Sequence, residues 1–426
     1  MSIKVLTLHS HTRKVSRNSN NTNTFGAMLK ISAKSHTLPI SPIRRLVPLA
    51  EAAAARGTHI YKLNIGQPDI QTPEEAVAAV QGINDKIYPY SHSAGLLPYR
   101  KKLVEYYAKN GIKLDVEDII VTLGGTEAAQ MAMLICANPG EEILVPEPFY
   151  ANYNTFAASY DTILVPVPST IDNDFALPPR EEFLKRITPR TRAILICNPN
   201  NPTGHLYTRE EMEMLADMAA HYNLYLISDE VYREFCYDGT KQTSALSLKG
   251  IHDNVVVIDS VSKRYSMCGV RLGNIVSRNK EVMAAALKLA QARLSPPYLA
   301  QIAASAAMDA PQKYYDDVVA EYTARRDCLV EELNKIPGVY SPKPQGAFYT
   351  MARFPVDDCH KFACWLLTDF SYKGATVQLA PASGFYATKG KGTQEARIAY
   401  VLCKEDLLAA CEILREALKV YPGRIE

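Results

Sequence analysis

Features that the sequence lacks exclude several classes of protein. None of its apolar runs approaches the roughly 20 residues that a membrane-spanning helix requires. Its 47 basic and 45 acidic side chains give the 426 residues a formal net charge of only +2, so no overall field attracts nucleic acid or anionic lipid. We therefore expect neither nucleic acid nor a membrane as a partner.

Cysteine pairs are also lacking. The nine cysteines are scattered, their total is odd and no CxxC motif occurs, which argues against a disulfide framework and against a zinc site. We accordingly expect no bound metal. A reducing environment fits this pattern, and we expect a cytoplasmic protein.

Acidic side chains are absent before Glu51, although eight lysines and arginines precede it. This basic segment, rich in Ser, Thr and Asn, is typical of an organellar transit peptide or of a disordered tail. A third interpretation is that the natural chain starts at Met28, because residues 38–57 (LPISPIRRLVPLAEAAAARG) look like the opening of a folded chain. We expect residues 1–30 to be a disordered extension, with a transit peptide as the alternative.

Seven apolar segments alternate with helical patterns along the middle of the chain. Most are nearly continuous apolar runs, which is typical of parallel strands covered on both faces. One helical pattern, residues 208–222, opens with a capping box formed by Thr208 and Glu211. The alternation predicts a three-layer αβα sandwich, of the α/β class, around a mostly parallel seven-stranded sheet. The predicted strands are residues 118–124, 141–148, 162–168, 192–199, 224–230, 255–260 and 273–277.

The pattern changes after residue 310. A long amphipathic helix is expected over residues 312–336, followed by short strands in GAFYTMA and RIAYVL with another helical segment between them. We expect a large domain over residues 76–310 and a smaller α+β domain over residues 311–426, to which residues 31–75 are joined. Two such lobes enclose a cleft.

Two nucleotide-binding fingerprints are missing. The chain has neither GxGxxG after a strand nor GxxxxGK[ST], so it offers no support for a dinucleotide site or a P-loop. GGTEA (124–128) nevertheless lies where a strand is expected to end and a helix to begin. There the backbone amides of Gly125 and Thr126 can bind a phosphate. On its own, a glycine turn with Thr126 as N-cap is the simpler explanation.

The stretch SVSKRYSMCGVRLG (260–273) follows the apolar run VVVID. If the strand continues, Ser260 and Ser262 share one face, Lys263 points to the other, and Arg271 lies across a turn. Two hydroxyls and a guanidinium would complete a phosphate site, and a lysine beside it can react with a carbonyl group. Taken alone, a solvated lysine and a surface arginine explain the stretch equally simply.

Two further strand ends carry polar residues. LISDEVY (226–232) places Asp229 at the end of a buried strand, where an unpaired carboxylate is costly unless it reaches solvent or a cation. NPNNPTG (198–204) contains two Asn-Pro steps, which predict a backbone fixed by turns or by a cis peptide and aiming a side chain. All of these polar clusters follow the carboxyl ends of predicted parallel strands, the edge at which open α/β sheets bind ligands.

Together the motifs resemble the fold-type I pyridoxal-phosphate enzymes, and specifically the aspartate aminotransferase-like class I/II aminotransferases. GGTEA, NPxNPTG, D-x-x-Y, SxSK with an arginine eight residues on, and ARIAY (396–400) occur in the family's order. The resemblance covers about residue 40 to the end of the chain. It implies a pyridoxal 5′-phosphate-dependent transaminase (EC 2.6.1.-) that moves an amino group from an L-amino acid to a 2-oxo acid by a ping-pong mechanism.

The resemblance also implies roles for individual residues. Its catalytic residues are Lys263, which holds the cofactor and moves the proton at the substrate Cα, Asp229, which pairs with the pyridinium nitrogen, and Tyr232. Arg397 binds the substrate α-carboxylate. Tyr90 is expected to reach the phosphate of a neighbouring subunit, which implies a homodimer with a shared site. The remaining implied contacts are Tyr232 and Asn201 at the phenolic oxygen, Gly125, Thr126, Ser260, Ser262 and Arg271 at the phosphate, Tyr150 stacked on the ring, and Asn201 and Gly66 at the substrate.

The substrate is less determined. A dicarboxylic substrate needs a second cation, and the lysine that some aspartate-specific relatives carry after the paired glycines is Thr126 in this chain. Arg293 is the nearest candidate for that cation. Aspartate with 2-oxoglutarate is our first expectation, and aromatic or neutral amino acids are the alternative. A carbon–sulfur or cyclopropane-forming lyase would use the same lysine and aspartate, whereas a regulatory module would need DNA-binding helices that the N-terminal tail does not show.

Overall fold

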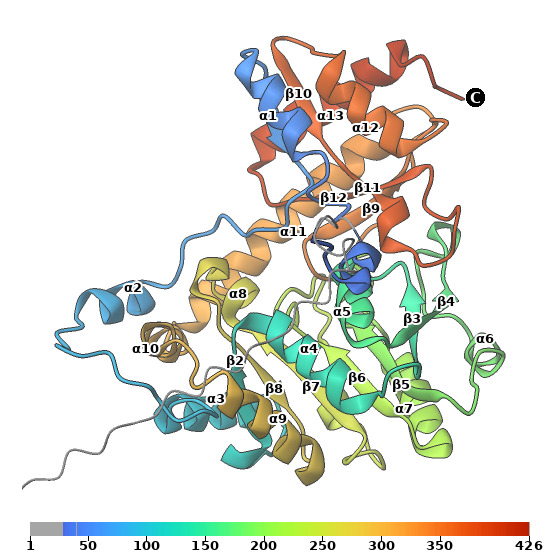
Figure 1. Ribbon diagram of the computed structural model, residues 1–426. Coiled ribbons are helices and arrows are strands. Elements are labelled where there is room, and N and C mark those ends of the chain that lie inside the picture. The colour runs from blue at the N-terminus through green and yellow to red at the C-terminus, as the bar shows by residue number, and fades with distance from the viewer. Residues whose placement is uncertain (1–28, 40, 426) are drawn as a thin grey trace, which may run out of the picture. The chain divides into compact units, whose positions relative to one another are not determined.

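Seven strands form the central sheet of the computed structural model, which describes residues 29–39 and 41–425 (Figure 1). Their order across the sheet is β2 (Ile119–Thr122), β8 (Gly273–Val276), β7 (Val255–Ser260), β6 (Tyr225–Asp229), β5 (Thr191–Cys197), β3 (Glu142–Glu147) and β4 (Ile163–Pro168). β8 runs antiparallel to both of its neighbours, and the other pairs are parallel. The predicted mostly parallel seven-stranded sheet is therefore confirmed, with each strand beginning and ending close to the expected residues.

Helices cover both faces of this sheet. α4 (Gly124–Cys136), α5 (Asn152–Tyr160) and α9 (Lys280–Ala292) pack with Ile143 and Leu195 on one face. α3 (Leu97–Lys109), α7 (Arg209–Tyr222) and α10 (Tyr298–Ala307) pack with Leu144 and Ile194 on the other. Successive strand residues point to opposite faces, so a strand that is covered on both sides must be apolar throughout. The three-layer αβα arrangement is confirmed.

A second group of elements has its own apolar core. β9 (Tyr349–Arg353) pairs antiparallel with β12 (Glu395–Ala399), which pairs with β11 (Ala380–Pro381). β1 (His59–Lys62) pairs parallel with β10 (Ala375–Gln378), so the segment before the large sheet contributes a strand here. The helices of this group are α1 (Val47–Ala55), α11 (Gln312–Asn334), α12 (Cys359–Thr368) and α13 (Lys404–Val420).

Short elements complete the described chain. They are η1 (Ala33–Thr37), α2 (Glu74–Gln81), η2 (Val116–Asp118), η3 (Ile171–Asn173), α6 (Arg180–Leu184), η4 (Ala245–Ser247), α8 (Val261–Arg264), η5 (Cys268–Val270) and η6 (Ala382–Phe385). Among the described residues, 29–38 and those from 39 to 425 fall into separate units. The predicted boundaries at residues 75 and 310 stay predictions. The predicted disordered extension covers residues 1–30, of which residues 1–28, including the predicted start at Met28, lie outside the described residues.

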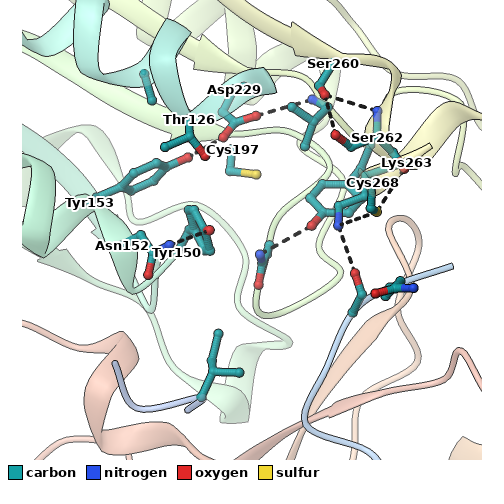
Figure 2. A pocket seen from close by; sticks show the side chains of 18 of the residues that line it. Thr126, Tyr150, Asn152, Tyr153, Cys197, Asp229, Ser260, Ser262, Lys263 and Cys268 are labelled. Carbon is teal, nitrogen blue, oxygen red and sulfur yellow. Dashed lines mark hydrogen bonds between the residues drawn. The ribbon is translucent and has the colours of Figure 1, made fainter. Parts of the chain in front are cut away.

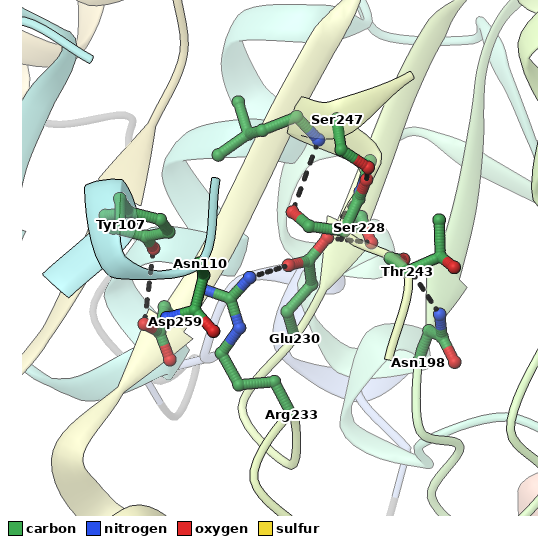
Figure 3. Close-up of polar contacts among 12 residues, drawn as sticks. Tyr107, Asn110, Asn198, Ser228, Glu230, Arg233, Thr243, Ser247 and Asp259 are labelled. Atoms are coloured by element: carbon green, nitrogen blue, oxygen red, sulfur yellow. Dashed lines mark hydrogen bonds and ion pairs between the residues drawn. The ribbon is translucent and has the colours of Figure 1, made fainter. Parts of the chain in front are cut away.

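Buried charges tie the loops at the carboxyl edge of the sheet to the strands (Figure 3). Arg264 donates to both carboxylate oxygens of Asp259, at 2.8 and 2.7 Å, and both side chains are almost fully buried. The Tyr107 hydroxyl donates to the same carboxylate at 3.2 Å. Directly after β6, Glu230 forms a second buried ion pair with Arg233, at 3.2 Å. A buried charge is tolerated only when it is paired and hydrogen-bonded, so these contacts fix the backbone on either side of β6 and β7.

The expected capping box opens α7. The Thr208 hydroxyl accepts a hydrogen bond from the Glu211 amide at 3.1 Å, and the Glu211 carboxylate accepts one from the Thr208 amide at 2.7 Å. Two amides that the helix itself cannot satisfy are thereby paired.

Replacing Thr208 by Ala removes half of this box, and we expect it to lower the free energy of unfolding by about 1 kcal/mol. Urea unfolding followed by circular dichroism measures the loss. Glu213→Ala is the control, because Glu213 forms only an exposed pair with Arg209 on the same helix and should contribute no more than about 0.5 kcal/mol. Equal losses in the two variants would contradict the role of the cap.

Candidate active site

A cavity of about 430 Å³ lies at the carboxyl ends of β5, β6 and β7, beside the first turn of α4. It brings together every candidate site residue that the sequence singled out except Tyr90 and Arg293. Those that line it are Gly66, Gly125, Thr126, Tyr150, Asn201, Asp229, Tyr232, Ser260, Ser262, Lys263, Arg271 and Arg397. The prediction that the polar strand ends meet at one edge of the sheet is therefore correct in its geometry.

One part of the cavity lining carries hydrogen-bond donors that suit an anion. The guanidinium of Arg271 lies against the start of α4, where its Nη2 is 3.5 Å from the Leu123 carbonyl oxygen. A Cβ on Gly124 would fall 2.5 Å from that Nη2, so only glycine permits this approach. The amides of Gly125 and Thr126, in the first turn, have no acceptor within the helix. A guanidinium and free helix amides together suit a phosphate.

Thr126 does not cap this helix. α4 begins at Gly124, with Leu123 in the N-cap position, and the Glu127 carboxylate accepts the Leu123 amide at 2.7 Å. The glutamate one turn into the helix satisfies the first amide, so the simpler explanation of GGTEA as a threonine cap is wrong. The side chain of Thr126 instead lines the cavity.

The chain after β7 turns instead of continuing as a strand. Ser260 ends β7, and its hydroxyl accepts the Ser262 amide at 3.1 Å, which caps the four-residue helix α8 (Val261–Arg264). The expectation that the strand runs on to Ser262 fails because this local hydrogen bond favours a helical start. The two hydroxyls nevertheless lie together, with their oxygens 2.8 Å apart (Figure 2).

Lys263 reaches the cavity from α8. Its Nζ donates to the Gly66 carbonyl at 2.8 Å and lies 3.6 Å from the Cys268 sulfur. A Cβ on Gly66 would overlap the Tyr349 hydroxyl, at 1.8 Å, so glycine is required where the two lobes of the site meet. The amine is thus oriented by a neutral carbonyl.

Asp229 ends β6 as a buried carboxylate. The Tyr153 hydroxyl donates to its Oδ2 at 2.8 Å, and the Val231 amide approaches its Oδ1 at 3.3 Å (Figure 2). Burial raises the pKa of Asp229 to about 6, against the opposing effect of the Tyr153 hydrogen bond. No cation among the described residues forms an ion pair with it. A cationic group placed in the cavity would supply the missing partner.

Arg397 presents the complementary case, a buried cation. Its Nη1 donates to Asn201 Oδ1 at 3.0 Å and its Nη2 to the Asn64 carbonyl at 2.6 Å, whereas its Nε is buried without an acceptor in the described part of the chain. The guanidinium lies 4.5 Å from the centre of the Tyr349 ring. Both of its protein acceptors are neutral, so the site suits a ligand carboxylate.

Asn201 and Tyr232 line the same cavity as Asp229 and Arg397. The Asn201 amide nitrogen lies 3.4 Å from the Tyr232 hydroxyl, which is 3.0 Å from the Tyr349 hydroxyl. Asn201 belongs to the NPNNPTG segment, for which the sequence predicts turns or a cis peptide. The Asn198-Pro199 peptide is cis. Tyr150 also lines the cavity, and its hydroxyl accepts a hydrogen bond from the Asn152 side-chain amide at 2.7 Å.

Two predicted residues lie elsewhere. Tyr90 is 78 % exposed and does not line the cavity of its own chain. Arg293 also lies outside the cavity lining, because its guanidinium is held by Glu127 at 2.9 Å and by the Ser93 carbonyl at 2.8 Å. The structure therefore does not bring Arg293 to a ligand in this chain.

Several lining residues were not foreseen. Tyr153 follows Tyr150 by three residues, and this Y-x-x-Y spacing next to a strand end is the signal that could have found it. Tyr349 lies in GAFY, a segment whose sequence predicts only a strand. Cys197, Cys268 and the segment 41–44 carried no comparable signal. Their positions depend on contacts between parts of the chain that are distant in sequence.

Over residues 29–39 and 41–425, no cluster of His, Cys, Asp and Glu has the arrangement of a metal site. No helix there has the length and apolar character to cross a membrane. All nine cysteines are free thiols.

The chain is similar to known proteins over most of its length. The family model for aminotransferase class I and II matches residues 58–414. An aspartate aminotransferase of Pyrococcus horikoshii is 32% identical over 86% of this chain and 92% of its own. An aromatic-amino-acid aminotransferase of Thermococcus litoralis is 32% identical over 89% and 96%. The solved aspartate aminotransferase of Thermus thermophilus with maleate superimposes with a TM-score of 0.83 at 27% identity, over 92% of this chain and 100% of that one.

The buried carboxylate makes the stability of the ligand-free protein depend on pH. Folding raises the pKa of Asp229 from 3.8 to about 6, so between these values the folded chain keeps a proton that the unfolded chain releases. The free energy of unfolding should therefore fall, relative to Asp229→Asn, by up to about 3 kcal/mol as the pH rises through this window. Urea unfolding of both proteins at about pH 4 and about pH 7 measures the difference. Parallel pH profiles would contradict the assignment.

Proposed function

The chain belongs to the class I and II aminotransferases, a family of pyridoxal-phosphate-dependent transaminases, and we propose that it transfers the amino group of aspartate to 2-oxoglutarate by a ping-pong mechanism. The observation that carries the proposal is the meeting of Lys263, Asp229, Arg397 and an anion-binding helix start in one cavity. Each group has chemistry that an amino-group transfer requires.

The residues present fit the cofactor. Arg271 with the α4 amides, Asn201 with Tyr232, and the buried carboxylate of Asp229 all line the same cavity. Arg271 would bind the phosphate, Asp229 the ring nitrogen, and Tyr232 with Asn201 the phenolic oxygen. Bound pyridoxal phosphate supplies an aldehyde that accepts the amino group and a ring that withdraws electrons from the substrate Cα.

Lys263 is the proton carrier in this proposal. Its amine would accept the proton from the substrate Cα and would return a proton to the cofactor carbon. The Gly66 carbonyl, 2.8 Å from Nζ, accepts one N–H and keeps the nitrogen lone pair directed into the cavity. Asp229, oriented by Tyr153, holds a proton on the ring nitrogen, so that this nitrogen stays cationic during the transfer.

Arg397 positions the substrate. Its guanidinium would form a bidentate pair with the α-carboxylate, and Asn201, already bonded to its Nη1, keeps the planar group in register. Gly66, which has no side chain, lets the Tyr349 hydroxyl approach the backbone at the cavity. This orientation presents the Cα–H bond to Lys263.

The alternatives are less well supported. The relatives at 32% identity are named as aminotransferases for aspartate and for aromatic amino acids, so an aromatic donor is the second candidate for the substrate. The lyase alternative is not favoured, because the matching proteins described above all bear transaminase names.

The half-reaction tests the function. Protein loaded with pyridoxal phosphate should convert it to the amino form when aspartate or glutamate is added alone, as followed by absorbance. Lys263→Ala should slow this conversion by about 100- to 10,000-fold, because no other group is positioned to move the proton. Formation of pyruvate, ammonia and hydrogen sulfide from added cysteine, without an acceptor, would indicate a carbon–sulfur lyase. A protein that responds to no amino acid would contradict the proposal.

A homodimer forms a second part of the proposal. Large apolar side chains are exposed on residues 87–97 and just before α10, and the Ser93 hydroxyl donates to the Leu294 carbonyl at 2.6 Å, which holds these two stretches together. The exposed side chains are Ile87, Tyr88, Tyr90, Leu97 and Leu294. Burial of such a surface against a second copy would stabilise a dimer and carry Tyr90 towards the partner's phosphate site.

Analytical ultracentrifugation should find a dimer, and Ile87→Asp should shift it towards monomer because a charge would be buried at the interface. Val420→Asp is the control, since Val420 is also exposed but lies at the end of α13. Tyr90→Phe should leave the dimer intact and weaken pyridoxal phosphate binding by about 5- to 10-fold. A monomeric wild-type protein would contradict this part.

A reducing location such as the cytoplasm is proposed on the nine free thiols, none of which forms a disulfide. Fractionation of the source cells together with N-terminal sequencing of the natural protein tests it. A processed protein recovered from an organelle would favour the transit peptide instead.

A further inference from the structure

The segment before α1 forms part of the cavity wall. Ser41, Ile43 and Arg44 line the cavity although they are more than 350 residues from Arg397 in sequence. The Asn64 amide nitrogen donates to the Ile43 carbonyl at 3.2 Å, and the Asn64 carbonyl accepts from Arg397 at 2.6 Å. These bonds connect the backbone next to Arg44 to the proposed α-carboxylate site.

The conformation of this segment is fixed on its other side as well. The Arg44 and Arg45 amides both donate to the Ser41 carbonyl, at 3.2 and 3.1 Å, which closes a turn. Pro42, within the turn, packs against Gly384. The backbone of Arg44 is therefore held at the cavity by contacts that do not involve its side chain.

The two adjacent arginines are used differently. Arg45 contacts His360 on α12 and does not line the cavity. Arg44 lines the cavity and is exposed to solvent, and among the described residues its side chain has no hydrogen-bond or ion-pair partner. Arg293, the cation that the sequence suggested for a distal carboxylate, is already held by Glu127. Arg44 is thus an available guanidinium at the site.

The charges that line the cavity do not balance. Four basic side chains, Arg44, Lys263, Arg271 and Arg397, face a single acidic one, Asp229. In the proposed function Arg271 meets the phosphate, Arg397 meets the substrate α-carboxylate, Asp229 meets the ring nitrogen, and Lys263 holds the cofactor and moves the proton. One cation, Arg44, remains without an anion. A substrate with a second carboxylate supplies it.

We propose that Arg44 binds the distal carboxylate of the substrate and so makes the enzyme selective for dicarboxylic amino acids and 2-oxo acids. This inference rests on the proposed function, because the same cavity must hold the α-carboxylate at Arg397. Ile43 and Ile65, which also line the cavity, suit the methylene groups between the two carboxylates. Selectivity then arises because a second carboxylate gains an ion pair with the solvent-exposed Arg44 that a neutral side chain cannot form.

The test compares Arg44→Gln with Arg45→Gln, a matched loss of the neighbouring positive charge outside the cavity. In single-turnover half-reactions, Arg44→Gln should lower kcat/KM for aspartate by about 10- to 100-fold and leave that for alanine and phenylalanine within about twofold. Arg45→Gln should match wild type for all three. Arg44→Lys, which keeps the charge, should recover part of the loss. An unchanged preference for aspartate in Arg44→Gln would overturn the inference while leaving the transaminase assignment intact.

A binding measurement decides the question without turnover. Calorimetry on the pyridoxal-phosphate-loaded proteins compares succinate, which has two carboxylates, with butyrate, which has one. Wild type and Arg45→Gln should bind succinate at least about tenfold more tightly than butyrate, and Arg44→Gln should lose this difference. Equal binding of the two acids by wild type would overturn the inference even if no amino acid reacted, whereas failure of the half-reaction with every amino acid overturns the proposed function. Melting temperature and bound-cofactor absorbance confirm that each variant is folded.

Discussion

The buried ion pair between Asp259 and Arg264 is the constraint on which the site depends. Asp259 is the next-to-last residue of β7 and Arg264 the last residue of α8, so the pair spans the turn that carries Lys263. A four-residue helix is not stable by itself, and the Ser260 cap accounts for only one of its hydrogen bonds. Both charged side chains are almost fully buried, so their mutual hydrogen bonds must offset the cost of removing them from water. The Tyr107 hydroxyl donates a further hydrogen bond to Asp259. The ion pair between Asp259 and Arg264 therefore fixes the turn that positions Lys263.

The sheet supplies the rest of the arrangement through one geometrical fact. Parallel strands end at the same edge, so Asp229, Ser260 and the segment after β5 lie together although they are separated along the chain. Arg397 joins them from β12, in the second group of elements, through Asn201. The cavity lies where these two groups of elements meet.

The sequence predicted the fold well because its strongest signal is the physical requirement of the fold itself. Strands such as β3 and β7 are buried along their whole length, so they appear as continuous apolar runs. Motif residues at strand ends were predicted for the same reason, since polar side chains beside buried strands stand out. The errors occur where a local hydrogen bond competes with the pattern. Ser260 turns the chain into α8, and Glu127 takes the capping role expected of Thr126.

What the sequence could not supply were contacts between distant segments. Tyr153 looks like a core aromatic until its hydroxyl is seen 2.8 Å from Asp229. Arg44 and Arg45 are indistinguishable as adjacent basic residues, and only the packing of the segment before α1 separates one at the cavity from one at His360. The place of Arg293 outside the cavity lining was equally hidden, because its partner Glu127 is recognisable only in three dimensions.

The unpaired charges explain how such a cavity selects its ligands. Without ligands, Arg397 is a buried cation bonded to neutral acceptors, and Asp229 is a buried carboxylate whose pKa is raised to about 6 by desolvation. Each state is unfavourable for the folded chain, and each is relieved by a ligand of the opposite charge. Binding the matching ligand therefore stabilises the fold as well as the complex. A ligand that lacks one charge leaves one protein group unpaired, so discrimination comes from the penalty on the wrong ligand as much as from contacts with the right one.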